Sequence, residues 1–125
     1  MKTLLGFLMI ANAALFFFGA VQHIGVTLGR FQEPRIIPAA IVETICGISL
    51  AWGAVIVLSH AVLLYRTPLV SNFIALCGVL LGMAALAAGR APRTASNDLY
   101  HHIMLSLIAT SFVVLVLAKS LASRA

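Results

Sequence analysis

Four long runs of apolar residues divide the chain, and each is close to the roughly 20 residues that a helix needs to cross a bilayer. The runs cover residues 3–21, 38–64, 68–89 and 99–118, and the links between them are short. Backbone inside a bilayer must satisfy its own hydrogen bonds, and these runs are too continuous for tilted strands. Short links between antiparallel helices therefore predict an all-α, up-down-up-down four-helix bundle, with residues 1–125 as a single membrane domain.

The composition strengthens this prediction. The chain is 62% hydrophobic and 9% charged, whereas soluble domains carry roughly 25% charged residues. A water-facing surface cannot be built from this sequence, so we interpret the chain as an integral membrane protein. The net charge of +5 does not indicate nucleic-acid binding, because the eight Lys and Arg residues are spread over segment ends and loops.

The beginning of the chain imitates a signal peptide, with Lys2, an apolar run and the small residues at 11–13. The apolar run continues to Val21, so we interpret it as an uncleaved first helix. Lys and Arg divide evenly between the two ends of the predicted bundle, and the positive-inside count is tied. We favour a bacterial inner membrane, with both termini in the cytoplasm and with the bilayer, other membrane subunits or further copies of the chain as partners.

Three ionisable residues are predicted to meet at one end of the bundle, which we call the loop end because it carries the links at residues 22–37 and 90–98. His23 ends the first apolar run, Glu43 lies about 8 Å inside the second at 1.5 Å per residue, and His102 begins the fourth. Ionisable residues inside membrane segments are expensive and mark functional sites. We therefore predict His23, Glu43 and His102 as proton-transfer or ligand residues.

The rim of this site is predicted to hold Gln22, Tyr100 and His101. Helical spacing puts His102 on one face of the fourth helix with Ser106, Ala109 and Thr110, and His101 on another with Leu105, Ile108 and Phe112. Because polar residues should face the bundle interior, we expect His102 to point inward and His101 to point toward lipid headgroups or a partner.

Helical spacing also predicts the packed faces of the other helices. They are Asn12, Phe16, Gly19 and His23 in the first, and Glu43, Gly47, Leu50, Ala51 and Ala54 in the second. A stripe of small residues in the third is assigned to close helix packing: Ser71, Ala75, Gly78, Gly82, Ala85 and Gly89. Cys46 and Cys77 are interpreted as buried thiols that act as small hydrophobic side chains, and a redox pair stays open.

Several kinds of chemistry are compatible with a glutamate and two histidines. A metal site would use such ligands, but no local ligand spacing supports one, and we predict none. A carboxyl beside an imidazole can exchange protons with a reduced quinone or a thiol in an apolar pocket. The structural alternative is that Glu43 pairs with Arg35 or His23 and only fixes helix register.

Three stretches resemble one known family. Gly19-Ala20-Val21-Gln22-His23-Ile24 resembles the Gly-x-x-His-Phe end of the first helix in DoxX-like proteins. Phe31 and Pro34, followed by residues 36–38, look like the loop of that family. Residues 41–50 look like its Glu-Leu-x-Gly-Gly-x-x-Leu segment.

The resemblance implies a four-helix inner-membrane protein tied to sulfur and thiol redox chemistry. It also singles out His23, Glu43 and Gly47 as the positions that match the motifs of the family. The namesake of the family is a subunit of a thiosulfate:quinone oxidoreductase. We therefore expect a membrane subunit of a quinone-linked redox system, with a quinone as the bound cofactor. Two alternatives stay open: a non-catalytic accessory subunit of a larger complex, and a small proton-coupled transporter. Small multidrug transporters carry their glutamate in the first helix, which here holds Asn12 and no acid.

Overall fold

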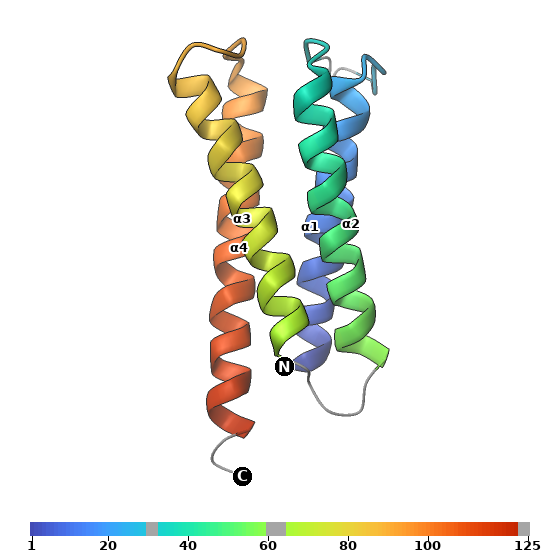
Figure 1. Cartoon of the computed structure of the whole chain (residues 1–125), viewed down its shortest axis with the longest axis vertical. Coiled ribbons are helices and arrows are strands. Elements are labelled where there is room, and N and C mark those ends of the chain that lie inside the picture. The colour runs from blue at the N-terminus through green and yellow to red at the C-terminus, as the bar shows by residue number, and fades with distance from the viewer. Residues whose placement is uncertain (30–32, 60–64, 123–125) are drawn as a thin grey trace.

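The computed structural model describes residues 1–29, 33–59 and 65–122, and within these ranges it contains four helices (Figure 1). They are α1 (Lys2–His23), α2 (Ile37–Ser59), α3 (Arg66–Ala87) and α4 (Ala95–Ala122). All four are long and apolar enough to cross a membrane. The predicted all-α class and the number of helices are confirmed for the described part of the chain.

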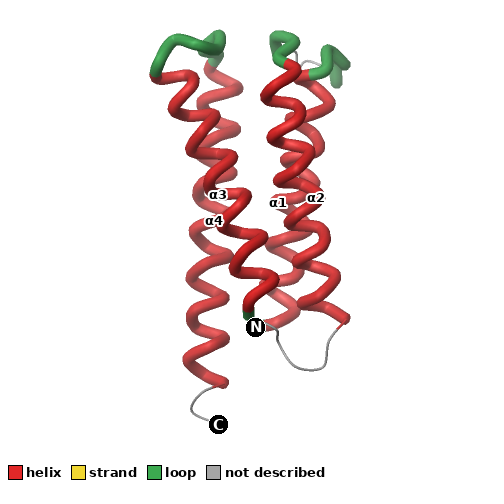
Figure 2. The backbone as a smooth tube through the Cα atoms, in the orientation of Figure 1, coloured by secondary structure: helices red, strands yellow, loops and turns green. Residues whose placement is uncertain are grey.

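The helices run side by side, and the α1–α2 and α3–α4 links lie together at the loop end (Figure 2). The N-terminus and the end of α4 lie at the opposite end. α1 packs most extensively on α2, and α3 contacts both α2 and α4, while α4 also contacts α1. The first and last helices thus close the arrangement, so residues of α1, α2 and α4 can meet at the loop end.

Two helix boundaries differ from prediction. The described part of α2 ends at Ser59, and the predicted end at residue 64 lies outside the described residues. α4 begins at Ala95 rather than at residue 99. The reason is an N-cap, because the Thr94 hydroxyl accepts a hydrogen bond of 3.1 Å from the backbone N–H of Asn97.

Replacement of Thr94 by Val should destabilise the protein by at least about 1 kcal/mol, the usual cost of losing an N-cap, because the same hydroxyl also donates to the Glu33 carboxylate. The measurement is unfolding of the detergent-solubilised protein in a denaturant titration. Thr110→Val is the matched control, because the exposed Thr110 hydroxyl bonds, among the described residues, only the carbonyl of Ser106 in its own helix. Equal losses for the two variants would contradict the capping role.

α1 and α3 end in the same way at the loop end. Gly25 (φ 102°) and Gly89 (φ 66°) adopt left-handed conformations. The residue after each glycine donates its backbone N–H to a carbonyl five residues earlier, over 3.2 and 2.9 Å respectively. This is the Schellman motif, which favours glycine because no Cβ is present. At the end of α1 the motif turns the chain shortly after His23. At the end of α3 the N–H donor of the motif is that of Arg90.

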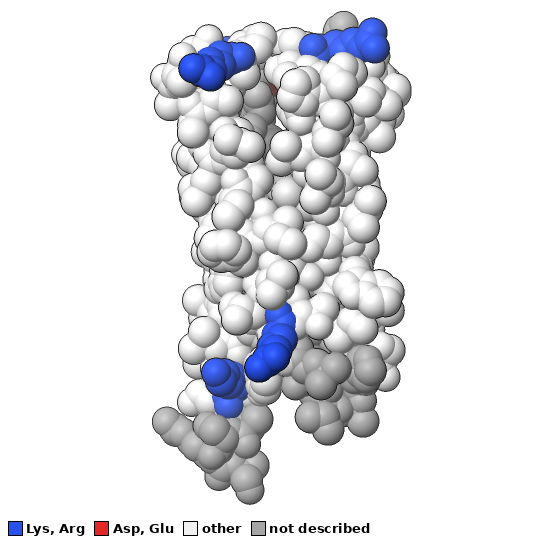
Figure 3. Space-filling model, in the orientation of Figure 1, with Lys and Arg blue, Asp and Glu red and all other residues white. Residues whose placement is uncertain are grey.

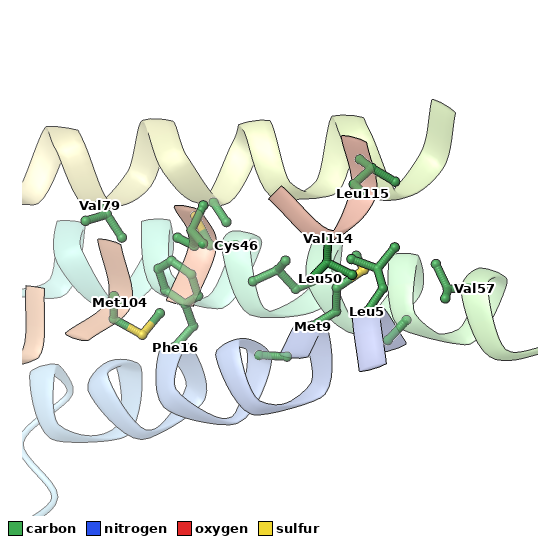
Figure 4. Packing of buried hydrophobic residues seen from close by; sticks show 14 residues of the cluster. Leu5, Met9, Phe16, Cys46, Leu50, Val57, Val79, Met104, Val114 and Leu115 are labelled. Carbon is green, nitrogen blue, oxygen red and sulfur yellow. The ribbon is translucent and has the colours of Figure 1, made fainter. Parts of the chain in front are cut away.

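The interior and the outer surface are both apolar. Figure 4 shows the buried core, to which all four helices contribute. Large apolar side chains such as Phe7, Trp52 and Val116 are exposed on the outside. On the face seen in Figure 3, Lys and Arg lie toward the two ends, with an uncharged band between them. A helix that is apolar all round is typical of a membrane span.

The predicted inward faces of α1 and α2 are confirmed. On α1 the four residues of the predicted face are buried, and on α2 only Ala51 is half-buried rather than buried. The small-residue stripe of α3 faces its neighbours along the helix, because Gly78 lies against Cys46 of α2 and Gly82 lies against His101 of α4. Gly89, which the prediction included, is the exception, because it follows the end of α3 and is exposed. Gly78 and Gly82 thus allow close packing within the bundle.

The predicted orientation of α4 is wrong. His101 is only 7% exposed, whereas His102 is exposed together with Ser106 and Thr110. The polar groups on the outer face need no interhelical partner, because the Ser106 and Thr110 hydroxyls donate to carbonyls one turn earlier, both over 2.8 Å. Cys77 is exposed as well, so its interpretation as a buried thiol is also wrong.

Candidate functional site

The centre of the candidate site is a buried pair formed by His23 and Glu43. The two atoms that face each other, His23 Nε2 and Glu43 Oε1, lie 3.8 Å apart. His23 Nδ1 lies 3.2 Å from the Pro34 carbonyl oxygen. A carbonyl can only accept, so Nδ1 carries the proton and Nε2 of the neutral ring is an acceptor. The loop before α2 thus orients the ring so that its proton-accepting nitrogen faces the carboxyl.

Tyr100 of α4 completes this cluster. Its hydroxyl donates to the Leu15 carbonyl over 3.3 Å and lies, like Glu43 Oε1, against Gly19 of α1. A Cβ added to Gly19 would lie 2.6 Å from both Glu43 Oε1 and the Tyr100 hydroxyl. The carboxyl and the phenol therefore occupy the space that any other residue at position 19 would fill.

One oxygen of the Glu43 carboxyl has no protein partner. Among the described residues, nothing hydrogen-bonds Oε2, although the atom is buried. Leaving a buried polar group unsatisfied costs about 1–3 kcal/mol, and more for a charged group. Arg35, which the structural alternative offered as a counter-ion, is exposed, and the carboxyl pairs with His23 instead. Oε2 is thus available to a donor that is not part of the described chain.

Glu43 lines a cavity of about 260 Å³, which we call the α2–α3 pocket. Figure 3 shows the surface hollowed between α2 and α3 near the loop end. Apolar side chains from α2 and α3 form most of the wall. Its polar lining consists of His23, Glu43, Arg90, Asn97, Tyr100 and His101.

His101 supplies a second acceptor to the α2–α3 pocket. Its Nδ1 lies 2.8 Å from the Asn97 carbonyl oxygen, so the proton is on Nδ1 and Nε2 of the neutral ring is unprotonated. Nε2 lies against Gly82 of α3, where a Cβ would collide with it. The ring also packs edge-on against Tyr100, with centroids 5.4 Å apart.

The structure therefore brings His23 and Glu43 together, as predicted, and does not add His102. His102 bonds the Asp98 carbonyl over 2.7 Å on the exposed side of α4 and lines neither pocket described here. His101, expected to point outward, takes its place. Gly47, which the resemblance singled out, lies next to the Phe17 ring, and a Cβ added to it would come within 3.0 Å of that ring.

A second cavity of about 310 Å³, the α1–α4 pocket, lies on the other side of the cluster. It shares His23, Asn97 and Tyr100 with the first pocket. Gln22, predicted at the rim, is buried and lines only this second pocket. The His23–Tyr100 side of the site thus separates two cavities.

Several polar residues of the two pockets were not predicted, and Asn97 and Glu33 have the clearest roles among them. Asn97 is buried and lines both pockets, and Glu33 accepts hydrogen bonds from the hydroxyls of Thr94 (3.0 and 3.1 Å) and Ser96. Glu33 thereby ties the α1–α2 loop to the N-terminus of α4, where a negative charge is favourable. A threonine just before an apolar run is an N-cap signal, and it could have placed Asn97 in the first turn of α4.

Within the described ranges, no three His, Cys, Asp or Glu side chains come close enough to share a metal ion. Comparison with known proteins also finds no relative: no family model, curated protein or solved structure matches the chain. The geometry of the site is therefore the ground on which a function can be argued.

Proposed function

We propose that this chain is an up-down-up-down integral membrane protein of the bacterial inner membrane, and the membrane subunit of a thiol- or sulfur-linked, quinone-dependent redox system. In this proposal the α2–α3 pocket binds the reduced quinone. One observation carries the proposal: Glu43 Oε2 is buried and unpartnered beside the proton-accepting nitrogen of His23. The resemblance to DoxX-like proteins points to the same residues.

Two polar atoms of the pocket favour a ligand that donates hydrogen bonds. Glu43 Oε2 and His101 Nε2 both accept, and both residues line the same cavity. A quinol carries two hydroxyl groups on one flat ring, whereas a thiol offers a single weak donor. Apolar walls with a few convergent polar groups are typical of sites for such headgroups. Two acceptors in one apolar pocket therefore favour a quinol over a thiol.

Oxidation of a quinol releases two protons and two electrons. The Glu43–His23 pair would take one proton and His101 the other, since each offers an unprotonated acceptor. The two electrons would pass through a redox centre in a partner subunit to an oxidised sulfur compound, which is reduced as the quinol is oxidised to the quinone. This chain would thus bind the quinol, orient it and accept its protons.

The direct test is a binding titration of the purified protein with decylubiquinol and decylubiquinone. We expect the quinol to bind about tenfold more tightly, since the quinone would leave Glu43 Oε2 and His101 Nε2 without donors, at a cost of at least ~1.4 kcal/mol. The His102→Ala variant should bind like the unmodified chain. Binding of neither form would favour the alternative of an accessory subunit without a ligand, and equal binding would contradict the donor preference.

A further inference from the structure

The α1–α4 pocket contains a buried donor that the function proposed above does not use. Gln22 is only 4% exposed, and within the described ranges its Nε2 has no hydrogen-bond partner. The neighbouring Glu33 carboxylate already accepts from the hydroxyls of Thr94 and Ser96. A buried N–H without an acceptor costs free energy. A ligand that brings an acceptor atom to Gln22 would remove this cost.

The shape of the pocket indicates what carries this acceptor. One part of its wall is apolar and is formed by Leu15, Phe18, Leu99 and Ile103. Leu99 and Ile103 are 61% and 43% exposed, so the cavity is bounded there by the outer surface of α4 and opens sideways. Glu33, Ser96 and Asn97 form the polar part at the loop end. A ligand entering from the side would place an apolar chain along α1 and α4 and its polar part toward the loops.

The depth of Gln22 along a spanning helix matches the depth at which the ester carbonyls of membrane lipids lie. Gln22 is the last residue but one of α1, so in a spanning helix it lies near the end of the hydrocarbon layer. Lipid ester carbonyls lie at this boundary between acyl chains and headgroups. A hydrocarbon chain below the carbonyl would then run along the apolar wall.

We propose that the α1–α4 pocket binds one acyl chain of a phospholipid, whose ester carbonyl accepts a hydrogen bond from Gln22 Nε2. This inference rests on the membrane insertion in the proposed function, but not on quinol binding. Because His23 and Tyr100 line both cavities, the lipid would also keep water from the rear of the His23–Glu43 pair.

The test compares two lipids that differ only at the proposed acceptor: dioleoyl phosphatidylcholine and its diether analogue, which lacks the ester carbonyls. The full chain is equilibrated with each lipid in detergent, and native mass spectrometry counts the lipids retained. We expect one ester lipid per chain, preferred about tenfold over the ether lipid. Gln22→Leu should retain both lipids at the level of the ether lipid, because it keeps the bulk and removes the donor. Ile103→Trp, at the exposed mouth, should lose both.

The controls separate this site from the quinol site. Glu43→Gln and His102→Ala should retain the ester lipid like the unmodified chain. Lipid preference without quinol binding would leave this inference standing and remove the proposed function, and quinol binding without lipid preference would do the reverse. Equal retention of the two lipids by the unmodified chain overturns the inference, as does a quinone that displaces the lipid. If Gln22→Leu does not fold, two other results decide the inference. The unmodified chain must prefer the ester lipid, and Ile103→Trp must no longer retain it.

Discussion

Replacement of Glu43 by Leu should weaken quinol binding by about 10- to 100-fold, because a quinol hydroxyl left without its acceptor in a buried pocket costs about 1–3 kcal/mol. Leu has a similar volume and carries no acceptor, so it removes both the unpartnered Oε2 and the pair with His23. The measurement is the same titration with decylubiquinol. The apolar substitution suits a buried position, and the chain should stay folded in the membrane.

Glu43→Gln separates binding from proton acceptance. Its amide N–H can donate to His23 Nε2, which leaves the amide oxygen to accept from the quinol. Binding should therefore stay within a few-fold of the unmodified chain, while quinol oxidation by native membranes that contain the intact complex should be lost. His101→Ala should weaken binding about tenfold, and His102→Ala should not change it. If both Glu43 variants disappear from the membrane, the residue is structural and the proposed function fails.

The features that the sequence predicts well are those that depend on neighbouring residues. Long apolar runs predict the four helices because only a helix satisfies so much buried backbone locally. The His23–Glu43 encounter follows from where two helices end and begin. In both cases the position of each residue along its own helix was enough for the prediction.

The orientation of α4 required information from other helices. The rule that polar residues face inward failed, because Ser106 and Thr110 satisfy their hydroxyls within α4. His101 instead turns inward, where Gly82 of α3 leaves space for its ring. No pattern within α4 shows that space, so the sequence favoured the wrong histidine.

Gln22 shows the same limit at the end of α1. Its neighbour His23 lines both pockets, whereas Gln22 lines only the α1–α4 pocket. Successive residues of a helix point about 100° apart, so two adjacent polar residues can serve different cavities. The prediction of a single rim could not separate them, because the presence of two cavities follows from how the four helices are spaced.

Replacement of Gly19 by Ala should damage both the fold and the site without removing any polar group. The new Cβ would lie 2.6 Å from Glu43 Oε1 and from the Tyr100 hydroxyl, so both must move. Overpacking of this kind costs about 1–3 kcal/mol, whereas Ala in place of Gly gains about 1 kcal/mol at most in helix propensity. The cost of the clash should exceed the gain in helix propensity. Quinol binding and the free energy of unfolding, measured in detergent, should therefore both fall.

A second substitution shows whether the clash is the cause. Tyr100→Phe removes one of the two atoms that the new Cβ meets, so Gly19→Ala should cost less in a Tyr100→Phe background than in the unmodified chain. Ala14→Val adds bulk on the exposed side of α1 and should change little. If Gly19→Ala is instead more stable than the unmodified chain, the carboxyl and the phenol do not meet over Gly19. If the clash is relieved but quinol binding stays weak, the Tyr100 hydroxyl is itself needed to hold Glu43 toward the pocket.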